Sequence, residues 1–201
     1  MTFANRLTVV ALWFLAPAAF AGNQWTVDMP RQNWASTDGM VDLQPLKPIS
    51  PASVADRLMI ADVIAHWGLA YDEGRLDVVR SLFTEDGILE GLSGSGKPHA
   101  TQMMHLVGRD AIAKAVAQQR AVQKDQRRHA MTNVVIEQLT ADTATAYAYA
   151  VVTAAGNGEL YLGASAIYRA ELKKEVDGCW RLKRFVIGLD SYRRLVRPAA
   201  K

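Results

Sequence analysis

The chain has 201 residues, half of them apolar, and a formal net charge of +3 at pH 7. That length and apolar content allow one folded domain with a sizeable core and exclude a chain that is disordered as a whole. The small charge gives no reason to expect a nucleic-acid partner, and the single cysteine, Cys179, excludes an intrachain disulfide.

The first 21 residues are typical of a secretory signal. Arg6 precedes an apolar run over 7–14, and Ala19, Phe20 and Ala21 form a small-x-small cleavage site. The apolar run is too short for a convincing transmembrane helix, which needs about 20 apolar residues. We therefore expect a periplasmic or secreted protein with no stable membrane insertion after cleavage; an uncleaved anchor is the alternative.

Three helices are expected after a region without regular structure. Residues 22–51 lack hydrophobic periodicity and carry several prolines, which predicts an extended arm or linker. Capping residues and apolar spacing then predict helices over 53–74, 76–83 and 109–123. Between the last two we expect a short strand at 88–90 and a glycine-rich loop, which we interpret as a flexible lid or hairpin tip.

From residue 130 onward the hydrophobic pattern changes to a period of two, with turn signals between the runs. Four long strands are predicted, over 130–139, 143–154, 160–175 and 179–189. In the second of them small alanines alternate with larger residues, which favours a sheet with helices packed on one face. Helices followed by an antiparallel meander indicate an α+β domain.

Two other motifs suggest sites and are rejected. Residues 91–97 have the spacing of a phosphate-binding loop, but Pro98 stands where the magnesium-binding hydroxyl belongs, and no helix begins there. No metal is expected either, because the four histidines lack tight ligand spacing: His66, His99, His105 and His129.

Basic residues gather at two places. Arg127 and Arg128 flank the end of the third predicted helix, where cations interact favourably with the helix dipole, and residues 193–201 form a basic C-terminal tail. We interpret both groups as solvated charge; a phosphate-binding or membrane-surface role is the alternative.

Asp72 and His129 form the main candidate site. Asp72 lies in the last turn of the first long predicted helix, inside its apolar stripe, where a carboxylate is costly unless it is paired. His129 begins the strand that this stripe would cover, and there His129, Met131 and Asn133 point the same way. A carboxylate that accepts a hydrogen bond from histidine fixes the tautomer of the ring and leaves its other nitrogen as a general base.

Five short motifs stand out by their order and spacing along the chain. They are Ile60 through Tyr71-Asp72, Leu82-Phe83-Thr84-Glu85-Asp86-Gly87, Gly108-Arg109-Asp110-Ala111-Ile112, His129-Ala130-Met131-Thr132-Asn133 and Trp180-Arg181-Leu182. Taken together, these motifs resemble a SnoaL-like domain. The resemblance covers residues 52–192 and implies a cone-shaped α+β barrel of the nuclear-transport-factor-two superfamily, with a curved, mainly antiparallel sheet wrapped over three N-terminal helices.

The branch that the chain resembles includes scytalone dehydratase, bile-acid dehydratases and hexachlorocyclohexane dehydrochlorinase, which use a His–Asp dyad without a cofactor. The resemblance implies that Asp72 is the acid of the dyad and His129 its base. It gives no clear match for the second histidine or the substrate-polarising tyrosines of those enzymes. Candidate substrate-binding residues are therefore assigned by location: Tyr71, Asn133, Trp67, Tyr147, Tyr149, Tyr161 and His105.

The implied function is a cofactor-free lyase or isomerase, dehydratase-like, that acts on a small hydrophobic molecule, cyclic or acyclic, as a homodimer. The alternative is a non-catalytic ligand-binding or assembly module on the same fold, in which the Asp–His pair only satisfies two polar groups. An enzyme needs His129 reachable from solvent, whereas a structural pair can be sealed. A partner-binding protein should expose an extensive apolar face on its sheet.

Overall fold

The computed structural model describes residues 31–94 and 99–190. The expected signal peptide at 1–21, the first residues of the arm and the tail at 193–201 lie outside this range. The helical elements are α1 (Trp34–Thr37), the 3-10 turn η1 (Pro51–Ser53), α2 (Val54–Asp72), α3 (Leu76–Ser81) and α4 (Arg109–Val122). The strands are β1 (Phe83–Ser93), β2 (Thr101–Val107), β3 (Gln126–Leu139), β4 (Thr143–Gly156), β5 (Glu159–Lys174) and β6 (Trp180–Leu189).

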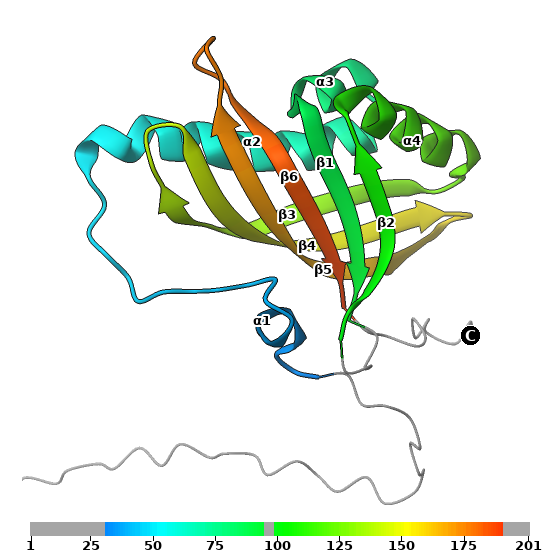
Figure 1. Cartoon of the computed structure of the whole chain (residues 1–201). Coiled ribbons are helices and arrows are strands. Elements are labelled where there is room, and N and C mark those ends of the chain that lie inside the picture. The colour runs from blue at the N-terminus through cyan, green and yellow to red at the C-terminus, as the bar shows by residue number, and fades with distance from the viewer. Residues whose placement is uncertain (1–30, 95–98, 191–201) are drawn as a thin grey trace, which may run out of the picture.

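The described strands form one six-stranded sheet in the order β2-β1-β6-β5-β4-β3. Neighbouring strands are antiparallel except β1 and β6, which are parallel. The sheet curves around α2, and α3 and α4 lie near one end of it (Figure 1). The predicted α+β class and curved sheet are confirmed, but the sheet is not closed, since β2 and β3 are its two edges. No described helix is long and apolar enough to cross a membrane.

The inner face of the sheet and the apolar stripe of α2 make the core. The alternation predicted for β4 places Ala146, Ala148 and Ala150 inward, each at most 2% exposed. These small side chains leave room for bulky ones from the helix, such as Ile64 and Trp67, which are also buried. Burial of this apolar surface is the main stabilising contribution, at about 25 cal/mol per Å².

The glycine-rich loop predicted after residue 90 is shorter than expected, because β1 continues to Ser93 and pairs with β2 in an antiparallel hairpin; this pairing agrees with the interpretation as a hairpin tip. The glycines serve close packing there. A Cβ built on Gly94 would lie 2.6 Å from the Trp34 ring, so only glycine leaves space for that indole. Glycine at position 94 therefore marks a contact with the arm.

The predicted arm is folded against the outer face of the sheet over part of its length. Trp34 and Met40 are buried against Val186 of β6, and the Trp34 indole nitrogen donates a hydrogen bond to Asp190 (3.0 Å). Beyond this contact the chain runs extended to η1 (Figure 1). The backbone amides of Asp42 and Gln44 still donate to Tyr147 and Glu137 of the sheet, whereas Leu46 is fully exposed. The arm thus covers part of the convex face and leaves the concave face to the helices.

Candidate active site

Asp72 and His129 meet where the end of α2 crosses the start of β3. The His129 ring donates from Nδ1 to Asp72 Oδ1 (2.6 Å), and the His129 backbone N–H donates to Oδ2 (2.7 Å). The side chain of Asp72 is 3% exposed, and that of His129 is 10% exposed. Because a carboxylate only accepts hydrogen bonds, Nδ1 carries a proton in this pair. The neutral ring therefore has its lone pair on Nε2.

The local sequence brings these two elements unusually close. Gly68 lies one helical turn before Asp72, and a Cβ on it would stand 3.0 Å from the His129 carbonyl oxygen and 3.2 Å from the His129 Cβ. The absence of a side chain at this position lets α2 approach β3 to the distance that the hydrogen bonds need. Glycine at position 68 therefore favours this close approach of the helix to the strand.

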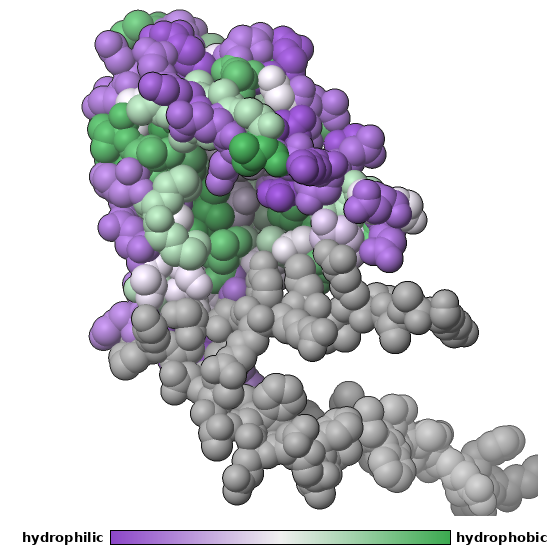
Figure 2. All heavy atoms as spheres, turned by 90° about the vertical axis from the view of Figure 1, so that its right-hand side faces the viewer, coloured by the Kyte–Doolittle hydropathy of each residue, from purple (hydrophilic) through white to green (hydrophobic). Residues whose placement is uncertain are grey.

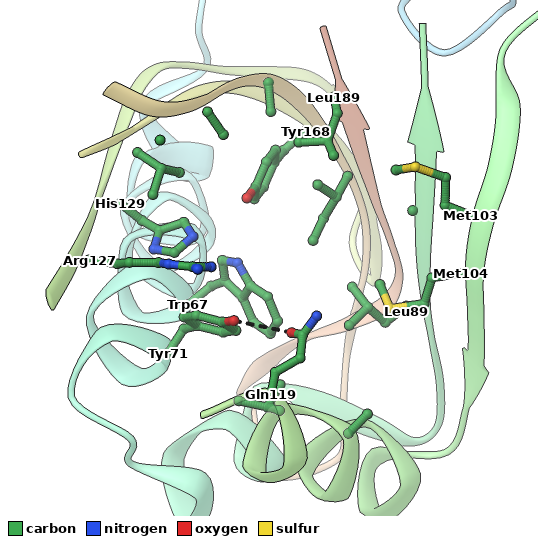
Figure 3. Close-up of a pocket in the computed structure, with 18 of the residues that line it drawn as sticks. Trp67, Tyr71, Leu89, Met103, Met104, Gln119, Arg127, His129, Tyr168 and Leu189 are labelled. Carbon is green, nitrogen blue, oxygen red and sulfur yellow. Dashed lines mark hydrogen bonds between the residues drawn. The ribbon is translucent and has the colours of Figure 1, made fainter. Parts of the chain in front are cut away.

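His129 faces a cavity of about 850 Å³ between the helices and the concave face of the sheet. Figure 2 views the molecule from the open end and shows a hollow with apolar residues on its walls and polar residues around it. The close-up in Figure 3 shows His129, Trp67 and Tyr168 around this space. The remaining walls are mostly apolar and include Leu89, Met103, Met104, Leu106, Val116, Val152, Ile187 and Leu189.

Tyr71 is the polar neighbour of the dyad. Its ring lies edge-on to the His129 ring, with the centroids 5.0 Å apart, and its hydroxyl donates to Gln119 Oε1 (3.1 Å; Figure 3). Burial raises the pKa of Tyr71, although the nearby Arg127 and Arg120 guanidinium groups partly offset the increase. Burial also raises the pKa of Tyr168. Both tyrosines therefore face the cavity as neutral hydroxyl groups at physiological pH.

The structure places three of the seven candidate substrate-binding residues on the cavity wall: Trp67, Tyr71 and Tyr161. Tyr147 and Tyr149 lie on the convex face, because they alternate with the inward alanines of β4. The Tyr147 hydroxyl accepts a hydrogen bond from the Asp42 amide of the arm (3.2 Å), and Tyr149 is half-exposed. Both side chains therefore point away from the cavity, and the prediction that they contact the substrate there is wrong.

Asn133 and His105 also lie away from the cavity. A register shift between Thr132 and Val135 interrupts β3, and Asn133 sits within it with a positive φ of 52° and an exposed side chain. This bulge cancels the simple alternation that would have placed Asn133 beside His129. His105 points to the outer side of β2, where its Nδ1 lies 2.9 Å from Glu90 Oε1.

The cavity residues that sequence reasoning missed include Arg127, Gln119 and Tyr168. Arg127 was interpreted as solvated charge, yet it precedes His129 by two residues on one strand and so shares its inward face. Tyr168 lies two residues from both Ala166 and Ala170 on β5, so it shares their inward face. The period-two pattern carried the signal for Tyr168, whereas for Arg127 the strand had to begin at Gln126, four residues before its predicted start. Gln119 lies on α4, whose orientation depends on tertiary packing.

Among the described residues, no group of three or more histidine, cysteine, aspartate or glutamate side chains is arranged to hold a metal ion. The polar groups at the cavity include the His–Asp pair, tyrosine hydroxyls, two glutamine amides, the Asp125 carboxylate and one guanidinium group. These groups can transfer a proton and can donate hydrogen bonds to an oxygen atom of a bound molecule.

The family model described as SnoaL-like domain matches residues 52–186. Among solved structures, an NTF2-like protein with a cystatin-like fold from Novosphingobium aromaticivorans is 24% identical, with a TM-score of 0.56, over 71% of this chain and 92% of that chain. A protein from Catenulispora acidiphila, in complex with S-DNPA, is 22% identical (TM-score 0.57; 67% and 93% covered). ActVI-ORFA from Streptomyces coelicolor is 19% identical (TM-score 0.55; 68% and 98% covered). These likenesses show the fold. No curated protein matches the chain in sequence.

Proposed function

The chain belongs to the SnoaL-like domain family, and on this basis we propose that it is a dehydratase-like lyase or isomerase that works without a cofactor. The family includes polyketide cyclases and dehydratases. In the proposed reaction His129 is the general base, and Asp72 fixes its tautomer. The substrate is a small hydrophobic molecule, in keeping with the mostly apolar cavity wall.

The observation that carries the proposal is the pair formed by Asp72 and His129 at the cavity wall. Both carboxylate oxygens of Asp72 are engaged by His129, at 2.6 and 2.7 Å, so the ring has little freedom to turn. A purely structural pair has no need of a cavity beside it. Here the ring forms part of the wall of an 850 Å³ space, which supports a role toward a bound molecule.

The proposed elimination begins when His129 Nε2 takes a proton from carbon. The electron pair of that C–H bond forms a C=C bond as a hydroxyl group leaves the neighbouring carbon, and the imidazolium passes its proton to the departing hydroxide to release water. In an isomerisation the same proton returns to a different carbon. Asp72 stabilises the imidazolium in either case, and the hydroxyl of Tyr168 donates to the oxygen that gains charge.

The proposal is tested with a panel of cyclic and acyclic β-hydroxy ketones, followed by the ultraviolet absorbance of the conjugated product. Exchange of substrate protons with deuterated water, followed by NMR, detects isomerases that release no water. We expect turnover by the wild type and its loss in His129→Gln and Asp72→Asn. Asp62→Asn is the matched control, because Asp62 lies on the same helix with its side chain 73% exposed. Activity that survives His129→Gln would contradict the mechanism.

A second candidate function is an assembly or ligand-binding module, and it has one observation in its favour. The convex face beyond the arm exposes Tyr149 (52%), Val135 (41%) and Val151 (40%). This apolar face also supports our proposal of a homodimer, which sedimentation of the purified protein would test. Ligand binding without turnover across the panel would favour the module. Export to the periplasm or medium stays a prediction from the first 21 residues.

A further inference from the structure

Arg127 is the one guanidinium group on the wall of the cavity, among the described residues. It stands two residues before His129 on β3 and extends toward the same space (Figure 3). Its side chain is 40% exposed, whereas that of His129 is 10% exposed. Arg127 therefore lies nearer the mouth of the cavity, and His129 lies deeper.

Asp125 holds this guanidinium group by one edge only. Arg127 Nε donates to Asp125 Oδ1 (3.0 Å), and Asp125 Oδ2 accepts a hydrogen bond from the Tyr161 hydroxyl (3.2 Å). The two terminal nitrogens of Arg127 form no hydrogen bond with the described residues. Together they present N–H donors in the fork geometry that matches a carboxylate.

The charges around the mouth favour an anion there. The positive charge of Arg127 lies on the cavity wall, where it partly offsets the burial that raises the pKa of Tyr71, and Asp125 engages only the Nε edge of this guanidinium group. The Asp72 carboxylate lies deeper and is fully engaged by His129. A carboxylate at the mouth would therefore meet unused donors and would keep part of its hydration, which lowers the cost of binding it.

We propose that Arg127, oriented by Asp125, binds a carboxylate group of the substrate, so that the substrate is a hydrophobic carboxylic acid bound with its anionic end at the mouth. Two residues along a strand span roughly 7 Å, so the carbon that loses its proton to His129 lies several bonds from the carboxylate. This inference deepens the proposed function and rests on it, since it takes the cavity to be the substrate site.

The test compares two probes of the same shape, 2-naphthoate and 2-naphthamide, by isothermal titration calorimetry on the full chain. A charged hydrogen bond contributes about 1.5–3 kcal/mol, so we expect the wild type to bind the naphthoate at least about tenfold more tightly. In Arg127→Gln this preference should fall to about one, with naphthamide affinity unchanged. Arg127→Lys, which keeps the charge but not the fork, should retain part of the preference.

Arg128→Gln is the matched control. Arg128 is the next residue on β3, faces away from the cavity, and pairs with Glu73 at the surface (3.3 Å). Its loss should leave the preference for naphthoate intact. Equal binding of the two probes by the wild type, failure of both to bind, or an unchanged preference in Arg127→Gln would overturn the proposal, as would an equal loss in Arg128→Gln.

Asp72→Asn separates this inference from the proposed function. It should abolish turnover and keep the preference for naphthoate. If the preference is absent while the dyad variants lose turnover, only the substrate class is wrong. If the preference is present while the dyad variants keep their activity, the mechanism is wrong and Arg127 still marks an anion site.

Discussion

Replacing Asp72 with asparagine should change the tautomer of His129 while the fold is kept. The backbone N–H of His129 can only donate, and it now faces one oxygen of Asp72 at 2.7 Å. In the variant, the amide oxygen must take that position, which turns the amide NH₂ toward Nδ1. The ring must then accept at Nδ1 and carry its proton on Nε2, the nitrogen that serves as the base.

The expected change in the free energy of unfolding follows from the two hydrogen bonds. Hydrogen bonds to charged groups contribute about 1.5–3 kcal/mol and neutral ones about 0.5–1.5 kcal/mol, so weakening both should lower the free energy of unfolding by about 2 kcal/mol. Solvent screens the pair little, because the two side chains are 3% and 10% exposed. A histidine held in the wrong tautomer should reduce turnover on the order of 10⁴-fold.

Nitrogen-15 NMR of histidine-labelled protein measures the tautomer without knowledge of the substrate. The wild type should show its protonated ring nitrogen at Nδ1 of His129, and Asp72→Asn should show it at Nε2; His129→Gln assigns the signals. Urea denaturation gives the change in unfolding free energy, with Asp62→Asn as the control. Retention of the Nδ1–H tautomer in Asp72→Asn would refute the reasoning, whatever happens to activity.

Three further predictions concern the surroundings of the site. Gly68→Ala should gain about 1 kcal/mol of helix propensity but lose about 1–3 kcal/mol to crowding against the His129 backbone, for a net destabilisation in urea melts and a weakened dyad signal by NMR. Trp34→Ala should destabilise the protein by about 3 kcal/mol or more and speed hydrogen exchange of the Asp42 amide; unchanged exchange would show that the arm is held elsewhere. Hydrogen bonds from Lys174 and Trp180 lower the pKa of Asp56 below its ordinary 3.8, so its contribution is complete above pH 3.8 and is lost as the pH falls through the lower folded value. Asp56→Asn should therefore flatten the fall in stability below pH 3.8, and an equally steep fall would contradict this assignment.

Much of the fold was predictable because its signals are local. The apolar stripe of α2 and the alternation in β4, β5 and β6 follow from backbone periods of 3.6 and 2 residues. The strand β2 was missed because Gly91 and Gly94 were read as signs of a loop. Gly94 is glycine because Trp34, 60 positions earlier in the chain, packs against it, and no local pattern records that contact.

For the candidate site, the sequence by itself determined that Asp72 needs a partner and that His129 stands at the start of a strand. A carboxylate inside an apolar stripe and a period of two are properties of short segments, independent of what lies across from them. Only the tertiary structure decided which face of each strand is the inner one, and so excluded Tyr147 and Tyr149. The bulge at Asn133 and the close approach of α2 to β3 at Gly68 also depend on the tertiary structure. The physical reason is that burial and register depend on contacts between segments far apart in the chain, and a hydrogen bond of 2.6 Å exists only once both are packed.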